Sequence, residues 1–277
     1  MKGGEDRPVS RPLFFETMSR RGCAYWRQYQ MGIIHKYALG SDWDEHLRHA
    51  RSLVLDYVHR RALRSLAIVG SGWLLDVPME ELLPQLESIT LIDISHPRQV
   101  ELRWSTQPKV HFISLDVTAG AVDRALRSMH GREPMESLEA ALKASPKPAL
   151  ALAVDGVVSL NLLSQLPLRL IDSTSQHYTV AQRQRMAALV QRHHLEWLSD
   201  FPTALLVTDV EESRFPLSPA QAQPSQVRPT VFIPLPHLAH GTCWEWVLDA
   251  QGVTYSGCRT VLSVVGGELP VSSTQCP

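Results

Sequence analysis

The sequence predicts an α/β protein: a mostly parallel, seven-stranded sheet with helices on both faces, an antiparallel terminal strand and an N-terminal helical extension. Short apolar runs alternate along the chain with longer stretches whose apolar residues recur every three or four positions. Several of these runs also end at a glycine turn or an aspartate. Alternating strands and helices favour a parallel sheet, which binds ligands where its strands end.

The N-terminal part of the chain is expected to be helical. Apolar residues have helical spacing over residues 25–39 and again over residues 43–63. Two such helices alone would bury only one face. We therefore interpret residues 1–64 as a helical lead-in and residues 65–277 as the main domain.

The strands and helices of the main domain follow from the same patterns. Apolar runs predict strands at residues 65–69, 88–94, 109–117, 149–160 and 203–210. Helical patterns separate them, at residues 77–86, 122–129, 135–144 and 179–201. Two further strands are expected around the C-terminal turn DAQG. Residues 215–236 contain six prolines and almost no charge, which predicts a long loop suited to a lid or a partner contact.

Composition and charge exclude several classes of protein. Hydrophobic residues make up 44% of the chain and charged residues 20%, and the net charge is -1. The chain therefore lacks the basic character of a nucleic-acid binder. The four cysteines form no CxxC pair, so we expect free thiols and no metal site. No apolar run reaches the length of a membrane span and the first residues lack a signal-peptide core, so we expect a cytoplasmic location without a membrane partner.

A glycine turn follows the first strand. Gly70, Ser71 and Gly72 stand where an apolar strand meets a helical pattern, so the backbone can approach a ligand closely and helix N–H groups are available. Asp93 ends the next strand, with Ile94 beside it, in the position where a carboxylate accepts hydrogen bonds from a ribose diol. The alternative is that the glycines only form a tight turn and the aspartate only caps a strand.

The third strand also ends in an acid. Asp116 can meet the amino group of an adenine ring, with Val117 packing on the ring, or it can form an Asx turn within its own loop. Three successive strand ends thus carry a glycine turn or an aspartate. Because the carboxyl ends of parallel strands lie at one edge of a sheet, a nucleotide-like ligand is expected there.

The order and spacing of these segments resemble a known family. The segments AIVGSG, LIDIS, VHFISLDVT, VDGVVSLNLLSQLP and ALLVTDV, over roughly residues 66–265, resemble class I S-adenosylmethionine-dependent methyltransferases. The stretch DGVVSLNLLSQL is similar to the segment that lines the methyl-donor pocket in that family. The turn GSGWLLDVP is also similar to a set of bacterial methyltransferase-like proteins. The resemblance implies a Rossmann-like fold with a reversed final strand, and S-adenosylmethionine as the cofactor.

The resemblance also implies roles for single residues. Gly70 and Gly72 would lie under the methionine part of the cofactor. Asp93 would hold the ribose, and Asp116 with Val117 would hold the adenine.

Other residues would border the sulfonium, namely Ser159, Leu160 and Asn161. The sequence departs from the family's pattern at two positions. Ile68 replaces the usual acid of the first strand, and Leu74 replaces the third glycine.

The acid lost at Ile68 has a possible substitute nearby. Asp76 could take its place, although a simpler interpretation is that Asp76 caps the helix expected near Pro78.

Residues that could position a methyl acceptor follow later strands. Asn161 and Gln165 can orient a substrate, and His177 and Tyr178 precede the long helix on the same side of the sheet. The acidic run TDVEE, residues 208–212, could attract a cation, but a solvated strand end is the simpler interpretation.

The predicted function is methyl transfer from S-adenosylmethionine to a small-molecule or peptide-like acceptor. One alternative is a non-catalytic binding or scaffold protein, which Ile68, Leu74 and the bulky Trp73 favour. Another is a nicotinamide-dependent oxidoreductase, because Asp93 suits the ribose of either cofactor; a reversed final strand favours the methyl donor.

Overall fold

The computed structural model describes residues 20–38, 42–129, 134–148, 150, 152–218 and 223–270. Several predictions concern residues outside these ranges. They include the expected absence of a signal peptide, the thiol of Cys276 and the centre of the proline-rich stretch, residues 219–222.

Helices and strands alternate along the described chain. The helices are α1 (Arg20–Ala38), α2 (Asp44–Arg61), α3 (Met79–Leu82), α4 (Arg98–Trp104), α5 (Ala121–Met129), α6 (Met135–Lys143), α7 (Leu168–Thr174) and α8 (Val180–Leu198). The strands are β1 (Ser65–Val69), β2 (Ser88–Asp93), β3 (Val110–Ser114), β4 (Gly156–Leu160), β5 (Ala204–Pro216), β6 (Gln226–Pro229), β7 (Ala239–Asp249) and β8 (Cys258–Glu268).

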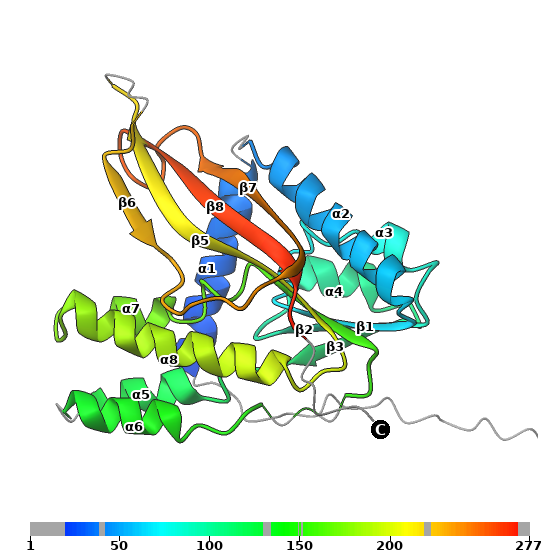
Figure 1. Ribbon diagram of the computed structural model, residues 1–277, viewed down its shortest axis with the longest axis horizontal. Helices are drawn as coiled ribbons and strands as arrows, with labels where there is room; N and C mark the ends of the chain where they lie inside the picture. Colours follow the sequence, from blue (N-terminus) through cyan, green and yellow to red (C-terminus); the bar gives the residue numbers. More distant parts are fainter. Residues whose placement is uncertain are drawn as a thin grey trace, which may run out of the picture.

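The strands form one mixed sheet in the order β3-β2-β1-β4-β5-β8-β7 (Figure 1). Strands β1 to β5 pair in parallel, and β8 runs antiparallel between β5 and β7. The expected Rossmann-like α/β class and its reversed final strand are confirmed. The sheet has eight strands rather than the seven expected, because β6 pairs antiparallel with β5 outside this order.

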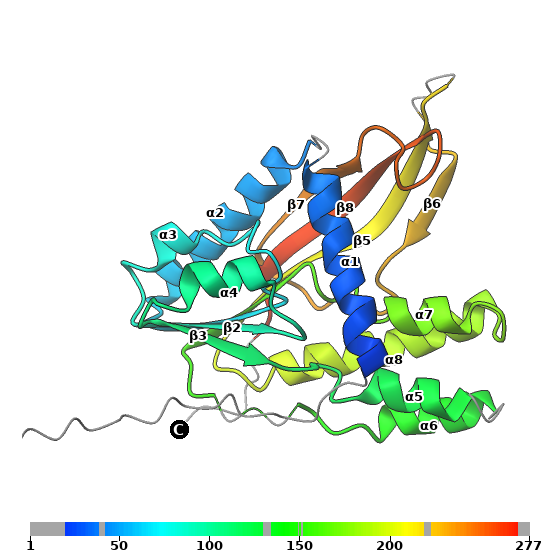
Figure 2. The same ribbon diagram turned by 180° about the vertical axis from the view of Figure 1, so that it is seen from behind.

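Each face of the sheet buries its own set of helices. In β1, Leu66 and Ile68 point into a core shared with α2, α3 and α4, whereas Ala67 and Val69 point into a core shared with α5 to α8. This alternation follows from the period of two in a strand. The two groups of helices lie on opposite sides of the sheet in Figures 1 and 2. Helix α2 precedes the boundary expected after residue 64, yet it packs into the first core together with strands of the main domain. The division of the chain into a helical lead-in and a main domain stays a prediction.

Strand β4 and helix α3 are much shorter than the sequence predicted. Strand β4 begins at Gly156 rather than near residue 149, and the carboxylate of Asp155 just before it accepts hydrogen bonds from the backbone of Arg64 and Ser65. Helix α3 spans only Met79–Leu82 instead of residues 77–86. The glycine turn therefore leads into an irregular loop and not directly into a helix.

The proline-rich segment differs from the expected long loop. Residues 215–216 belong to β5, and residues 226–229 form β6, which pairs antiparallel with β5. Past β6, the side chain of Gln191 in α8 donates to the carbonyl of Thr230 and accepts from the amide of Phe232. The described part of the segment is thus joined to the sheet and to α8, and its role as a lid or a partner contact stays a prediction.

In the described part of the chain, no helix combines the length and the apolar character needed to cross a membrane. Cys243 and Cys258 are free thiols, as expected. The cytoplasmic location stays a prediction.

Candidate functional site

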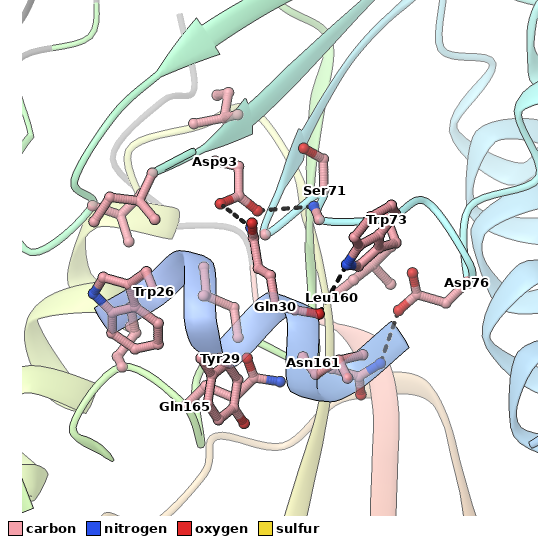
Figure 3. A pocket seen from close by; sticks show the side chains of 18 of the residues that line it. Trp26, Tyr29, Gln30, Ser71, Trp73, Asp76, Asp93, Leu160, Asn161 and Gln165 are labelled. Atoms are coloured by element: carbon pink, nitrogen blue, oxygen red, sulfur yellow. Dashed lines mark hydrogen bonds between the residues drawn. The ribbon is translucent and has the colours of Figure 1, made fainter. Parts of the chain in front are cut away.

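A cavity lies at the carboxyl ends of β1 to β4 and encloses about 1090 Å³ of space, part of it open to solvent. Most of the residues expected to bind a cofactor line it, namely Gly70, Ser71, Gly72, Asp93, Ile94, Asp116, Val117, Leu160 and Asn161. Figure 3 shows several of these side chains pointing into one space.

The glycine turn has an unusual backbone. Gly70, Gly72 and Leu74 all adopt the left-handed conformation, with φ of 77°, 44° and 58°. A Cβ atom on Gly70 would lie 3.1 Å from the carbonyl oxygen of Leu160, whereas one on Gly72 would meet nothing closer than 3.8 Å. The turn at Gly70 is therefore closed by β4, while Gly72 faces open space in the cavity. The left-handed conformation that a third glycine would adopt freely is kept here by a leucine.

Asp76 does not cap a helix, which corrects the simpler interpretation made from the sequence. Helix α3 is preceded by Pro78 and has no side-chain cap. Asp76 instead lines the cavity, where its Oδ2 lies 2.9 Å from the side-chain amide nitrogen of Asn161 (Figure 3). Burial raises the pKa of the Asp76 carboxyl group.

Asp93 ties the ends of two strands together. Its Oδ2 accepts a hydrogen bond from the backbone amide of Gly72 at 2.8 Å, and its Oδ1 accepts from the amide of Ser95 at 3.2 Å. The side chain is half-buried, and burial raises the pKa of its carboxyl group although these hydrogen bonds act against the shift. It is thus less exposed than a plain strand end would be.

Helix α1 covers the cavity, which the sequence did not reveal. The side-chain amide of Gln30 donates to Asp93 Oδ1 at 3.1 Å and to the carbonyl of Ser95 at 2.9 Å. The indole of Trp73 donates to the carbonyl of Gln30 at 2.9 Å (Figure 3). Figure 2 shows α1 in front of the sheet. Trp26 and Tyr29 of the same helix also line the cavity. The pattern of apolar and polar residues in a helix does not show which of its residues will line a cavity formed by distant segments.

Asp116 forms the Asx-type turn that was the alternative to adenine binding. Its Oδ1 accepts from the amide and the hydroxyl of Thr118, at 2.9 and 2.7 Å, and its Oδ2 accepts from the amide of Gly120 at 3.1 Å. Burial raises the pKa of this carboxyl group. Asp116 and Val117 still line the cavity, so the turn presents them to a ligand while fixing the loop.

The residues at the end of β4 divide between two environments. The hydroxyl of Ser159 lies on the face of the sheet that α8 covers, 2.9 Å from Nε2 of His194 in that helix. Ser159 does not line the cavity. Leu160, Asn161 and Gln165 do line it. The Ser159 side chain therefore cannot border a ligand in this cavity.

The other residues considered for an acceptor lie elsewhere. His177 is exposed and Tyr178 packs against the second core, and neither lines the cavity. The acidic run of β5 is not a solvated strand end, which corrects that expectation. Asp209 is buried and accepts from Ser164 at 2.6 Å, and Glu212 is buried between Arg214 and Arg228.

Two buried polar atoms at the cavity have no hydrogen-bond partner in the described part of the chain. They are the hydroxyl oxygen of Ser71 and the polar atom of the Asn161 carboxamide that does not contact Asp76. Both residues are more than nine-tenths buried. Since buried polar groups are generally hydrogen-bonded, these atoms fit a site completed by a ligand. The open space beside Gly72 fits the same interpretation.

The fold and the site define a Rossmann-like α/β protein with a ligand cavity at its strand ends. No protein-family model matches the chain, and no curated protein matches it by sequence. Solved structures with a similar arrangement include an N-methyltransferase, NodS, from Bradyrhizobium japonicum WM9 in complex with S-adenosyl-l-homocysteine. It is 12% identical, the match covers 82% of this chain and 89% of that one, and the TM-score is 0.36.

Two further structures are similar to the same degree. One is Burkholderia thailandensis 1,6-didemethyltoxoflavin-N1-methyltransferase with bound 1,6-didemethyltoxoflavin and S-adenosylhomocysteine, with 15% identity, 95% and 92% coverage and a TM-score of 0.37. The other is CalS10, an amino pentose methyltransferase from Micromonospora echinaspora with bound S-adenosylmethionine, with 12% identity, 93% and 84% coverage and a TM-score of 0.29. Likeness of this degree says nothing about the ligand of this chain.

Proposed function

We propose that this protein transfers a methyl group from S-adenosylmethionine to a small-molecule or peptide-like acceptor. The observation that carries the proposal is the single cavity that gathers the glycine turn, Asp93, Asp116 and Asn161 from the ends of four neighbouring strands. In open α/β sheets, ligands bind at this edge.

Each part of the cofactor has a matching part of the cavity. The open space beside Gly72 offers room for the methionine part, and Asp93 offers a carboxylate for the ribose diol. The loop at Asp116 and Val117 would take the adenine. The cofactor supplies an electrophilic methyl group when bound. The chain itself would align the acceptor, with Asn161 and Gln165 at the cavity wall, and exclude water beneath α1.

The topology favours a methyl donor over a nicotinamide cofactor. Asp93 suits the ribose of either, so this residue does not discriminate. The reversed strand β8 between β5 and β7 belongs to the family that the sequence resembles, and a dinucleotide dehydrogenase has no need of it.

One observation favours the alternative of a non-catalytic binding protein. The side-chain amide of Gln30 already uses the carboxylate oxygen of Asp93 that a ribose would need. In a scaffold protein this contact would be permanent, whereas in a methyltransferase the cofactor must displace it.

Thermal unfolding with added ligands tests the proposal. Purified protein free of bound ligand is heated alone and with S-adenosylmethionine, S-adenosylhomocysteine or NAD. A ligand at a hundred times its dissociation constant stabilises the folded state by about 2.7 kcal/mol, which shifts the melting temperature visibly. A shift with both adenosyl ligands and none with NAD is expected. A shift with NAD alone, or with none of the three, overturns the proposal.

A further inference from the structure

A chain of hydrogen bonds runs from β7 to the cavity wall and fixes where its protons lie. The indole Nε1 of Trp244 lies 3.1 Å from Nδ1 of His46. An indole nitrogen only donates, so Nδ1 of His46 accepts and carries no proton. Burial lowers the pKa of His46 to about 3, so the ring is neutral and its proton is on Nε2. His46 is also held in place, because its ring stacks on Trp246 at a centroid distance of 3.8 Å.

The proton on His46 Nε2 needs an acceptor. The carboxamide of Asn161 lies beside it. In one orientation, the carboxamide nitrogen lies 3.2 Å from His46 Nε2 and 2.9 Å from Asp76 Oδ2. The carboxamide oxygen then has no partner in the described residues. In that orientation, two N–H groups face each other. A half-turn of the carboxamide exchanges its oxygen and nitrogen and places the oxygen against His46.

The same half-turn sets the state of Asp76. The Asn161 oxygen then also faces Asp76 Oδ2, and two oxygen atoms at 2.9 Å need a proton between them. We propose that Asp76 is protonated in the ligand-free cavity and that a positively charged group of the ligand replaces this proton. Binding therefore releases one proton to the solvent, and the Asp76 carboxylate forms an ion pair with the entering cation. This inference deepens the proposed function and rests on it.

The surroundings of Asp76 support a neutral carboxyl group. Burial is the main cause of the raised pKa of Asp76. Its own backbone amide and the charge of Arg51 act in the opposite direction, as would a hydrogen bond donated by Asn161 if the carboxamide were not turned. Arg51 of α2 is exposed and directs its guanidinium group at the carbonyl of Leu75. His46 is neutral, so Arg51 is the cation on the described elements that lowers this pKa. An entering cation would find an acid without a salt-bridge partner.

The chemistry of the site is that of a cation subsite with aromatic walls. Trp43, His46 and Trp246 line the cavity near Asp76, and aromatic faces attract cations. Three cations could use it under the proposed function: the sulfonium of S-adenosylmethionine, the ammonium of its amino-acid end, or an amine acceptor. Neutral methylthioadenosine carries none of them.

Calorimetry in phosphate and Tris buffers counts the protons released, because the two buffers differ in ionisation heat. Titrations with S-adenosylmethionine, S-adenosylhomocysteine and methylthioadenosine, and with n-butylammonium on protein saturated with S-adenosylhomocysteine, are run between about pH 5 and 8. Release with both amino-acid ligands identifies the ammonium, and release with S-adenosylmethionine alone identifies the sulfonium. Release with n-butylammonium alone identifies an amine acceptor. In each case the affinity for the cation rises by up to about tenfold per pH unit below the pKa of Asp76.

Matched variants assign the proton to its residue. Asp76→Asn keeps the shape of the carboxylic acid and should abolish the release while leaving methylthioadenosine binding unchanged. Asp209→Asn removes another buried carboxyl group of raised pKa that lies outside the cavity lining, and it should leave the release intact. No release with any of the four ligands, or release that persists in Asp76→Asn, overturns the inference. If the adenosyl ligands bind and none of the four ligands causes release, only this inference fails. If no adenosyl ligand binds at all, the proposed function itself fails.

Discussion

The side-chain amide of Gln30 donates a hydrogen bond to Asp93 Oδ1 at 3.1 Å and thereby occupies the carboxylate that the proposed cofactor needs. The same amide donates to the carbonyl of Ser95 at 2.9 Å, and the indole of Trp73 holds the Gln30 carbonyl from the other side. Gln30 and Trp73 thus help to hold helix α1 over the cavity by polar contacts. If Asp93 holds the ribose as proposed, the cofactor and Gln30 compete for one of its carboxylate oxygens.

Removing the Gln30 side chain should therefore strengthen cofactor binding. Gln30→Ala frees Asp93 from a hydrogen bond worth about 1 kcal/mol, which corresponds to about fivefold tighter binding of S-adenosylhomocysteine. Gln28→Ala, at an exposed position of the same helix, serves as the control and should leave the dissociation constant unchanged. Isothermal calorimetry measures both. Weaker binding in Gln30→Ala would mean that Gln30 contacts the ligand directly.

Asp93 should matter for both binding and folding. Asp93→Ala removes the proposed ribose partner, and binding of S-adenosylhomocysteine should fall by about 100-fold or more. It also leaves the amides of Gly72 and Ser95 without their acceptor, which should cost about 1–3 kcal/mol of the free energy of unfolding. Urea denaturation and a binding titration on the same variant separate the two effects, and unchanged binding would refute the site assignment.

The two glycines of the turn should respond differently to substitution. A Cβ on Gly70 would press against Leu160 and Leu162, so Gly70→Ala should lower the free energy of unfolding by about 1–3 kcal/mol. Gly72 also has a positive φ, so a side chain there strains the backbone, but it has open space beside it. Gly72→Ala should therefore cost less of the free energy of unfolding than Gly70→Ala and should weaken ligand binding, because its Cβ would narrow the space left for the ligand. Melting temperatures with and without S-adenosylhomocysteine distinguish the two. Equal losses of stability would show that the space beside Gly72 is not free.

The strand ends could be predicted because their signals are local in the sequence. Apolar runs that finish in a glycine turn or an aspartate placed Gly70, Asp93 and Asp116 at one edge of the sheet, and all three line one cavity. Ser159, which the family resemblance placed beside the sulfonium, does not line the cavity, since adjacent residues of a strand point to opposite faces. Its hydroxyl instead lies 2.9 Å from Nε2 of His194, a residue of α8.

The remaining parts of the site depend on contacts between distant segments. Gln30 reaches Asp93 only because α1 docks across the strand ends, and Asp76 meets Asn161 only because the loop after the glycine turn folds back. In the same way, Glu212 is buried because Arg228, from the next strand, neutralises it. The pattern of charges in one segment cannot show which partner another segment will supply.

Leu74 offers a test of the altered glycine turn. Its φ of 58° strains any residue with a Cβ, yet its side chain is buried in the first core. Leu74→Ala loses the burial and keeps the strain, whereas Leu74→Gly loses the burial and relieves the strain. Glycine should therefore be the more stable of the two by about 1 kcal/mol, the reverse of the order in a helix. Chemical denaturation gives the comparison, and a more stable alanine variant would show that the turn is not strained.

His194 should make the stability of the protein depend on pH in the acid range. Burial lowers its pKa from 6.5 to about 3. Below pH 6.5 the unfolded chain binds a proton that the folded protein refuses, so the free energy of unfolding falls by up to about 1.4 kcal/mol per pH unit. Buried carboxyl groups of raised pKa, such as Asp209, act in the opposite direction, so the test is a difference between variants.

His194→Gln removes the titrating ring and keeps a polar group near Ser159. The stability of the wild-type protein relative to this variant should decline steadily from about pH 6.5 towards about pH 3 and stay constant above about pH 7.5. His111→Gln, the same substitution at an exposed position of β3, is the matched control. Urea denaturation at a series of pH values gives the free energies. A constant difference between wild type and His194→Gln would mean that His194 becomes charged within the fold, and its contact with Ser159 would then need another explanation.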